Sequence, residues 1–137
     1  MVWKDSGKKT RRTTMKKIET TKAPGAIGPY SQAILGGNLI FVSGQLPLDP
    51  ETGDLKLDIQ EATKQSLENI KAILEEAGAG LDKVVKTTIF ITNMKDFPLV
   101  NEVYGAYFTD HKPARSCVEV MSLPKGANVE IEAIALG

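Results

Sequence analysis

The sequence predicts a single α+β domain in which two helices pack on one face of a β-sheet. Strand-like and helix-like segments follow one another in the order β-β-α-β-α-β-β, and a short strand at 16–20 can precede them. The 137 residues suffice for one domain and are few for two. Two helices shield only one face of such a sheet, and the strands are apolar on more than one face. We therefore expect oligomerisation to cover the second face.

The composition gives the chain no general electrostatic preference for a partner. Lys plus Arg and Asp plus Glu number 17 each, so the net charge is zero and does not attract nucleic acid or anionic membranes. One cysteine and one histidine exclude an intrachain disulfide, a cysteine-rich metal site and a two-histidine zinc motif. No segment is long and apolar enough to span a bilayer. We therefore expect a soluble, cytoplasmic protein without a bound metal.

The charge is unevenly distributed along the chain. Residues 1–14 contain five basic residues against one acidic residue and show no apolar periodicity. Because clustered charge without core-forming residues stays disordered, we expect a disordered basic extension at 1–14 and a single domain at 15–137. A basic arm for nucleic acid and a targeting segment are the alternatives for this extension.

The domain begins with a loop that leads into a β-hairpin. KAPGAIGPYSQA at 22–33 is rich in Gly and Pro and predicts an ordered loop with turns. ILGGNLIFVSGQL at 34–46 holds two apolar runs divided by Gly-Gly-Asn. This pattern predicts strands near 32–36 and 39–44 joined by a tight turn. A loop, PLDPETGD at 47–54, follows the hairpin.

Two helices are predicted from apolar residues at helical spacing. The first spans 58–77: Asp58 and Glu61 resemble a capping box, and Gly78 ends the pattern. Its buried face comprises Ile59, Ala62, Ser66, Leu67, Ile70, Ile73, Leu74 and Ala77. We expect Asp96 to cap the second helix and Gly105 to permit its close packing. That helix has Pro98 in its first turn and an apolar face of Val100, Val103, Tyr104, Tyr107 and Phe108.

Three further segments have strand composition. The segment 83–93 is expected to place four residues on one face: Val85, Thr87, Ile89 and Ile91. Strands near 114–121 and 128–136 follow, with the turn SLPKGAN between them. The last strand is apolar on both faces, with Val129, Ile131, Ala133 and Ala135 on one face and Ile134 and Leu136 on the other.

Arg115 is the residue that the strand pattern explains least, because a guanidinium is costly to bury and never loses its charge. It shares a strand face with Cys117 and Glu119. If the last two strands pair as a hairpin about Lys125, this face also gathers the carboxylates that follow, Glu130 and Glu132. Two interpretations remain open from spacing alone: an internal ion pair of Arg115 with Glu119 or Glu132, and a site for an external carboxylate.

Other polar residues are weaker candidates for a site. Cys117 lacks an adjacent base in its expected strand, and a free cysteine is usually a small buried hydrophobe, so a thiol nucleophile is the less favoured interpretation. Tyr30 and Ser43 stand near loop or strand ends, where ligand contacts often gather.

Five segments together resemble the RidA (YjgF) family, and the resemblance runs from about Met15 to the C-terminus. The last of them, with its P-A-R-S-C-V-E-V block, is the most specific. The segments are AIGPYSQA (26–33), FVSGQLPLDPETG (41–53), QSLENIKAILEEAG (65–78), VVKTTIFITNMKDF (84–97) and PARSCVEVMSLPKGANVEIEAIA (113–135).

This resemblance implies a fold, an assembly and an activity. The fold is chorismate-mutase-like (YjgF-like) α+β, and the assembly is a homotrimer whose sheets form an inner barrel with three sites in the clefts between subunits. The activity is hydrolysis of reactive enamine and imine acids, such as 2-aminoacrylate with its tautomer 2-iminopropanoate, and 2-iminobutanoate, to 2-keto acids and ammonia. No cofactor is implied, because an imine carbon is already electrophilic.

The resemblance also implies residue roles. Arg115 matches the arginine that binds the substrate carboxylate, and Glu130 matches the residue that positions or activates the attacking water. A glutamate beside a bound anion in a poorly hydrated cleft is expected to have a raised pKa. The other matching pocket positions are Tyr30, Ser43, Gly44, Asn101 and Cys117.

The resemblance leaves open the preferred substrate side chain and two alternative functions. The segment TDHKPARS is short and has Lys112 where some relatives place a longer loop ending in an aromatic residue, so the preference for a substrate side chain is undetermined. A non-catalytic trimer that binds small carboxylates and an RNA-acting translation inhibitor are the alternative functions. Arg115 together with Glu130 favours the enzyme, and the zero net charge argues against RNA.

Overall fold

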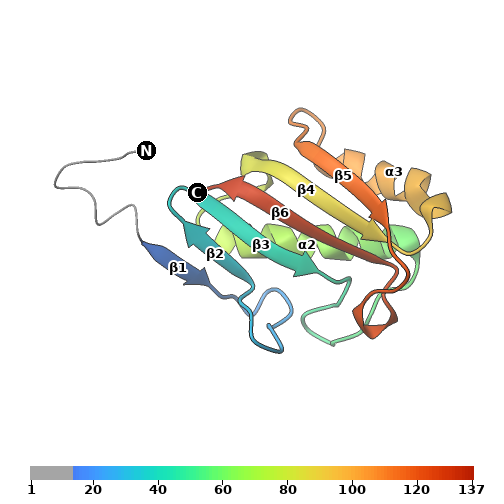
Figure 1. The fold of residues 1–137 in the computed structure, drawn as a ribbon, viewed down its shortest axis with the longest axis horizontal. Coiled ribbons are helices and arrows are strands. Elements are labelled where there is room, and N and C mark those ends of the chain that lie inside the picture. Colours follow the sequence, from blue (N-terminus) through green and yellow to red (C-terminus); the bar gives the residue numbers. More distant parts are fainter. Residues whose placement is uncertain (1–13) are drawn as a thin grey trace.

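The computed structural model describes residues 14–137 and confirms the two-layer α+β architecture (Figure 1). The predicted extension at 1–14 lies, except for Thr14, outside the described residues. The helices are α2 (Ile59–Glu76) and α3 (Phe97–Tyr107). The strands are β1 (Met15–Ile18), β2 (Ala33–Gly36), β3 (Leu39–Gln45), β4 (Val84–Ile91), β5 (Ala114–Glu119) and β6 (Val129–Leu136).

The six strands form one sheet in the order β1-β2-β3-β6-β4-β5. The last two strands do not meet the condition of pairing as a hairpin, because β4 lies between them: β5 pairs with β4 in parallel, and β6 pairs with β3 and β4 in antiparallel fashion. The burial of the two strands explains this order. Side chains of β6 are apolar on both faces and suit the centre of the sheet, whereas β5 is largely exposed and suits an edge.

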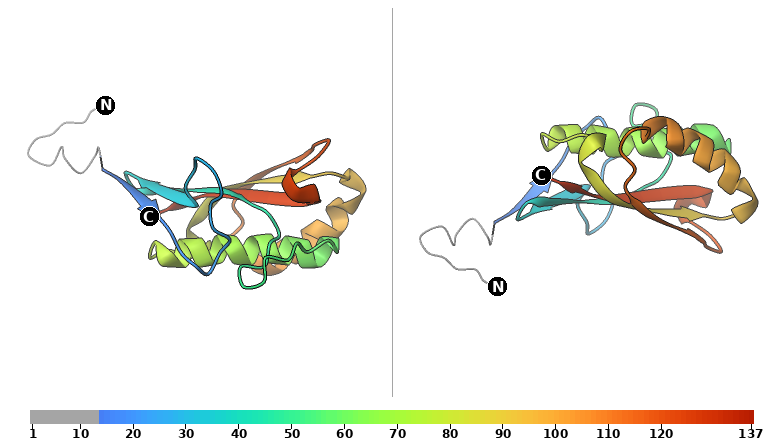
Figure 2. Two further views of the ribbon diagram at one scale, coloured as in Figure 1. Left: turned by 90° about the horizontal axis from the view of Figure 1, so that it is seen from below. Right: turned by 90° about the horizontal axis from the view of Figure 1, so that it is seen from above.

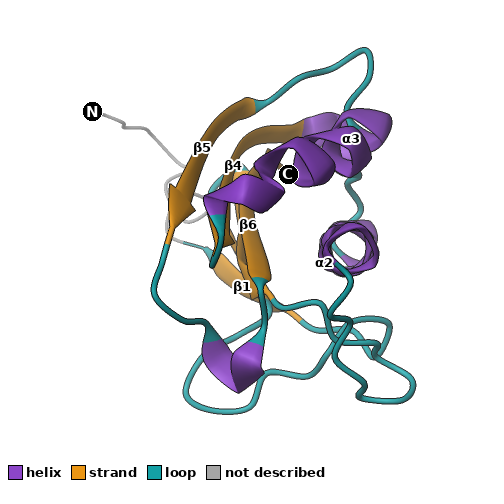
Figure 3. Ribbon diagram, turned by 90° about the vertical axis from the view of Figure 1, so that its right-hand side faces the viewer, coloured by secondary structure: helices purple, strands orange, loops and turns teal. Residues whose placement is uncertain are grey.

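Both helices cover the same face of the sheet, and the core lies between the two layers (Figures 2 and 3). The side chains of Ile70, Ile73 and Ile131 are at most 1% exposed there. The predicted start and end of α2 are confirmed: an Asp58 oxygen accepts a hydrogen bond from the Glu61 N–H at 3.1 Å, and Gly78 follows the helix with a φ of +83°.

Three local expectations are wrong. Val85 is exposed, because an irregularity in the pairing between Val84 and Lys86 turns it away from the buried face. Asp96 has helical backbone angles and makes no capping bond. Gly105 is exposed, and a Cβ at this position would have no atom within 4 Å, so this glycine does not serve close packing.

The opposite face of the sheet carries a row of apolar side chains that neither helix of residues 14–137 covers. Ile34, Phe41 and Ile134 are directly paired across β2, β3 and β6, and Phe41 is 46% exposed. Ile134 and Leu136 lie on this face as the alternation of β6 predicted. No helix of the described residues is long and apolar enough to cross a membrane.

Candidate active site

The two charged candidates, Arg115 and Glu130, lie on opposite faces of the sheet within one chain. Arg115 is paired with Thr87, whose side chain is buried against α3. Glu130 stands between Val129 and Ile131, which are fully buried on the helix side, so its own side chain points to the other face. The expectation that one polar face of a single chain gathers Arg115 with Glu130 is therefore wrong.

Arg115 belongs to a cluster that we call the arginine site, formed by Phe97, Asn101, Tyr104, Arg115 and Cys117. One guanidinium nitrogen of Arg115 donates a hydrogen bond to the Asn101 side-chain oxygen at 2.8 Å. The guanidinium carbon lies 5.2 Å from the Phe97 ring centroid and 4.9 Å from that of Tyr104. Both distances are within the range of cation–π attraction. Because a guanidinium has five N–H donors, this arrangement leaves donors for a ligand.

An internal ion pair does not account for Arg115. Among residues 14–137 the ion pairs are Lys17–Glu19 and Lys56–Asp49, and Arg115 is in neither. The Glu119 carboxylate instead accepts a hydrogen bond from the Met94 N–H at 2.7 Å. Arg115 is exposed, so its charge stays hydrated on the side that the rings do not cover.

Cys117 lies beside Arg115 and is half-buried against the core. Burial raises the pKa of its thiol, and the nearby Arg115 charge lowers it by a smaller amount. The net direction favours the protonated thiol, which is a poor nucleophile. This environment agrees with a lining role for Cys117 better than with covalent catalysis.

Glu130 lies in a second site that we call the glutamate pocket, a cavity of about 600 Å³. Burial, and to a smaller extent the neighbouring Glu132, raise the pKa of its carboxyl group. The direction matches the expectation from the sequence, although the causes are burial and a like charge within the protein. The residues that line the glutamate pocket are Pro24, Gly25, Ile27, Tyr30, Gln32, Ser43, Gly44, Gln45, Leu46, Leu48, Pro124, Lys125, Glu130 and Glu132.

Gly44 makes room for the Glu130 carboxylate. A Cβ at position 44 would lie 2.5 Å from one carboxylate oxygen of Glu130, far inside van der Waals contact. Any larger residue would displace the glutamate. Ser43 is fixed next to it, because its hydroxyl donates to the Ser31 carbonyl at 2.6 Å and its N–H donates to the Gln32 carbonyl at 2.9 Å.

Two buried amides hold the walls of the glutamate pocket. The Gln32 side chain accepts from the Thr20 N–H at 2.7 Å and donates to the Pro24 carbonyl at 2.8 Å, which fixes the loop before β2. The Asn69 side chain donates to the Leu46 and Leu48 carbonyls at 3.1 and 3.0 Å, which fixes the segment after β3.

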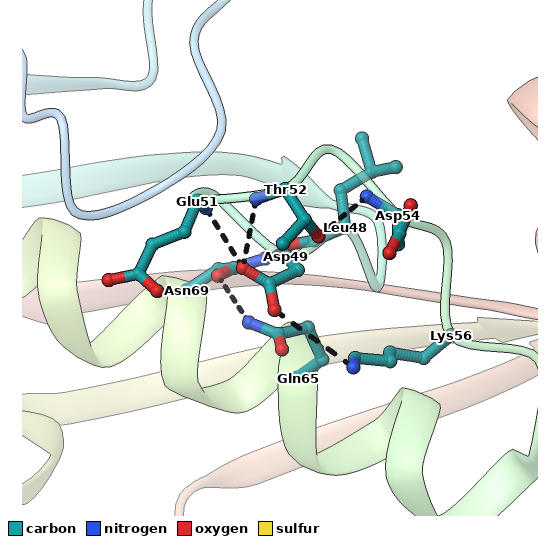
Figure 4. Close-up of polar contacts among 8 residues, drawn as sticks. All are labelled: Leu48, Asp49, Glu51, Thr52, Asp54, Lys56, Gln65 and Asn69. Carbon is teal, nitrogen blue, oxygen red and sulfur yellow. Dashed lines mark hydrogen bonds and ion pairs between the residues drawn. The ribbon is translucent and has the colours of Figure 1, made fainter.

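The Asn69 contact continues into a small polar cluster between α2 and the loop at 48–56 (Figure 4). Gln65 donates to the Asn69 side-chain oxygen at 3.0 Å, and an Asp49 oxygen accepts from the Glu51 N–H at 2.8 Å. The sequence analysis missed Asn69 and Gln32. The available signal for Asn69 was an amide next to Ile70 within the apolar stripe of α2, where a buried polar group requires partners.

Comparison with known proteins decides the family. A family model described as Endoribonuclease L-PSP matches residues 20–137. This chain belongs to that family, the RidA (YjgF) family. The RidA-family chain is 51% identical over 124 residues to an Escherichia coli protein named 2-iminobutanoate/2-iminopropanoate deaminase, covering 88% of this chain and 97% of the relative.

Solved structures agree with this assignment. A conserved Rid family protein from Yersinia pestis superposes with a TM-score of 0.89 at 54% identity, covering 90% of this chain and all of the other. Escherichia coli TdcF with bound serine superposes with a TM-score of 0.86 at 49% identity, covering 89% and 98%. The RidA-like fold is therefore shown at high similarity.

The structure of this RidA-family chain divides the expected site residues into two groups. Asn101, Arg115 and Cys117 lie in the arginine site. The other four line the glutamate pocket: Tyr30, Ser43, Gly44 and Glu130. The members of each group lie close together in one chain, but the two groups lie on opposite faces of the sheet.

Proposed function

We propose that this protein hydrolyses reactive enamine and imine acids, such as 2-aminoacrylate with its tautomer 2-iminopropanoate, and 2-iminobutanoate, to 2-keto acids and ammonia. The observation that carries the proposal is the state of Arg115, an exposed guanidinium backed by two aromatic rings and engaged in no ion pair with Glu119 or Glu132. The name of the Escherichia coli relative supports the substrate class.

Arg115 would bind the substrate carboxylate. A planar guanidinium can donate two parallel hydrogen bonds to a carboxylate, which fixes both the position and the orientation of the bound acid. Asn101 occupies one nitrogen and the rings cover part of the guanidinium. The substrate carbon at the imine is then held in one place relative to the protein, which lowers the entropic part of the barrier.

Glu130 would move the protons of the reaction. As a carboxylate it accepts a proton from water while the water oxygen bonds to the imine carbon and the C=N electron pair moves to nitrogen. The resulting carboxylic acid then donates this proton to the amine nitrogen. The remaining proton of the former water, now on the hydroxyl oxygen, then passes through the Glu130 carboxylate to the nitrogen, the C–N bond breaks as the C=O bond forms, and ammonia and the 2-keto acid leave. A raised pKa suits a group that must both take and give a proton near neutral pH.

The proposal includes a homotrimer with active sites in the clefts between subunits and with the sheets forming an inner barrel. Arg115 and Glu130 point to opposite faces of one chain, so a second copy is needed to bring an arginine site against a glutamate pocket. The apolar row of Ile34, Phe41 and Ile134 supports burial of the open face in such an assembly.

The deaminase is favoured over the RNA-cleaving activity that the family name Endoribonuclease L-PSP suggests. Metal-independent RNA cleavage commonly uses a pair of acid–base groups, most often histidines. This chain has one histidine, His111, whose ring nitrogen contacts the Val84 carbonyl. A single histidine engaged with the backbone does not provide that pair.

A coupled assay tests the proposed function. An amino-acid oxidase generates imino acids in situ, and release of the 2-keto acid is followed with and without the protein. We expect acceleration over spontaneous hydrolysis by the full-length chain and little by Arg115→Ala. Binding of 2-keto acids without acceleration would instead identify the non-catalytic carboxylate-binding trimer, and cleavage of an RNA substrate would identify the nuclease.

A further inference from the structure

We infer that Tyr104, anchored by Thr87, is a positioning residue for Arg115 and sets the orientation in which the guanidinium meets a carboxylate ligand. The inference rests on the proposed function and adds two residues to it. The sequence pattern places Tyr104 on the apolar face of a helix and Thr87 on the buried face of a strand, where packing alone would explain both.

The hydrogen bond between Thr87 and Tyr104 is the first observation. Their hydroxyl oxygens lie 2.7 Å apart in the core beneath the arginine site. Thr87 is 1% exposed and Tyr104 is 7% exposed. Either hydroxyl would lose its hydrogen-bond partner if the other were removed, so this pair holds the Tyr104 ring at a defined depth against β4.

The second observation is that Thr87, Tyr104 and Arg115 each contact the other two. Thr87 and Arg115 are directly paired between β4 and β5. Thr87 bonds to the Tyr104 hydroxyl, and the Tyr104 ring lies 4.9 Å from the guanidinium carbon of Arg115. Thr87 of β4 therefore contacts both the strand position that carries Arg115 and the Tyr104 ring that supports the Arg115 side chain.

Arg115 needs such support because its surroundings restrain it weakly. β5 is an edge strand paired only with β4, and the guanidinium is exposed. The side chain is long and rotamer-rich, so an unsupported guanidinium would sample many orientations. Asn101 restrains one nitrogen, and the ring faces restrict the plane of the group.

The contact between Tyr104 and Arg115 involves a neutral ring. Burial raises the pKa of the Tyr104 hydroxyl, and this effect exceeds the lowering by the Thr87 hydrogen bond and the Arg115 charge. The hydroxyl therefore stays protonated at neutral pH. The guanidinium is attracted to the face of the ring and keeps its charge available for a ligand.

The test compares two tyrosines of α3. Tyr104→Phe and Thr87→Val each break the Thr87–Tyr104 bond, whereas Tyr107→Phe is the matched control, because the Tyr107 hydroxyl donates to Glu68 at 2.6 Å, toward α2. Binding of 2-oxobutanoate to each full-length variant is measured by calorimetry, and Tm, KM and kcat are measured in the oxidase-coupled assay.

We expect Tyr104→Phe and Thr87→Val to raise the Kd for 2-oxobutanoate and the KM about 3- to 10-fold, with kcat changed by less than about twofold. Tyr107→Phe should leave all three constants unchanged. In an Arg115→Lys background, Tyr104→Phe should lower Tm by the same amount as it does in the wild-type background. It should add no further loss of binding, because the guanidinium that Tyr104 positions is absent from this background.

The outcomes separate this inference from the proposed function. If the wild type binds 2-oxobutanoate without accelerating hydrolysis, the function fails while the variants still test the positioning. If Tyr104→Phe and Thr87→Val lower only Tm, as a packing role predicts, the positioning inference is overturned and the function stands. A wild type that neither binds 2-oxobutanoate nor accelerates hydrolysis would overturn both.

Discussion

The arginine site and the glutamate pocket place their charged groups in contrasting environments. Arg115 is exposed, rests on two aromatic rings and donates one hydrogen bond, to Asn101. Glu130 is half-buried, lies against Gly44 and has a second carboxylate, Glu132, in the same pocket. The first environment preserves a permanent charge and orients it, whereas the second makes ionisation harder.

This difference corresponds to two separate tasks. A group that binds a carboxylate must remain charged and have a fixed direction, which aromatic faces and one amide provide without neutralising it. A group that transfers protons must change its charge readily, which burial and a like charge promote. The predictions below test whether the two sites divide binding from proton transfer in this way.

The largest expected effect is on turnover by Glu130→Gln. The amide keeps the shape of the side chain but cannot take up and return a proton, so kcat should fall about 10²- to 10⁴-fold while KM changes little. Gly44→Ala should also lower kcat, because the added Cβ would lie 2.5 Å from the Glu130 carboxylate in its present position and displace it. A loss of affinity with an unchanged rate would show that Glu130 binds substrate.

Stability should move in the opposite direction in Glu130→Gln. The pKa of Glu130 is raised in the folded chain, so its contribution to stability is fully present below the unfolded pKa and is lost as pH rises through the folded pKa. Removing the ionisable group should therefore raise Tm near neutral pH and have no such benefit in acid. Thermal melts of the two proteins across this range would measure the difference.

Arg115→Lys should impair the other half of the comparison. Lysine keeps the charge but lacks the planar fork, so kcat/KM should fall about 10- to 10⁴-fold, nearly as much as in Arg115→Ala. Because Arg115 makes no ion pair with Glu119 or Glu132, Tm should change little in either variant. Lys95→Met, which removes an exposed positive charge near α3, is the control and should keep full activity.

An active Arg115→Lys variant would contradict the division of roles. A positive charge alone would then suffice, and the aromatic support of the guanidinium would have no catalytic meaning. The melting temperatures identify a second failure, since a strongly destabilised Arg115→Ala variant would indicate a structural role for this residue.

The elements of this fold follow from local sequence signals, whereas the order of the strands does not. Gly-Gly-Asn fixes the first hairpin, and Asp58 with Gly78 bounds α2, because turns and caps depend on neighbouring residues. The pairing of β5 with β4 depends on which strands best fill the centre of the sheet, a choice made across the whole domain.

The site was predictable to the same extent. Family motifs name Arg115 and Glu130, but their separation onto opposite faces follows from the strand order, which the sequence pattern misjudged. The supporting residues Gln32, Asn69 and Tyr104 were missed or assigned to packing, because their partners are backbone carbonyls or side chains distant in sequence. A polar residue within an apolar helical stripe, such as Asn69 in α2, is the sequence signal for such a buried partner.

A smaller effect is expected on the pH dependence from Glu132→Gln. Glu132 contributes to the raised pKa of Glu130, so removing its charge should lower that pKa while burial keeps it above the ordinary value. The free enzyme needs ionised Glu130 to accept a proton, so the acidic limb of the kcat/KM profile should move to lower pH. An unmoved limb would mean that Glu130 does not control it.

The smallest expected effect is on activity after Cys117→Ser, because neither site gives the thiol a chemical task. Burial raises the pKa of Cys117 more than Arg115 lowers it, so little thiolate is available as a nucleophile. Serine is close in size and keeps the backbone of β5, so kcat/KM should stay within about threefold of the wild type. A loss above about 10³-fold in a folded variant, or a trapped thiol-linked intermediate, would show covalent catalysis. That outcome would move proton transfer and bond formation into the arginine site and end the distinction between a binding site on one face and a proton-transfer site on the other.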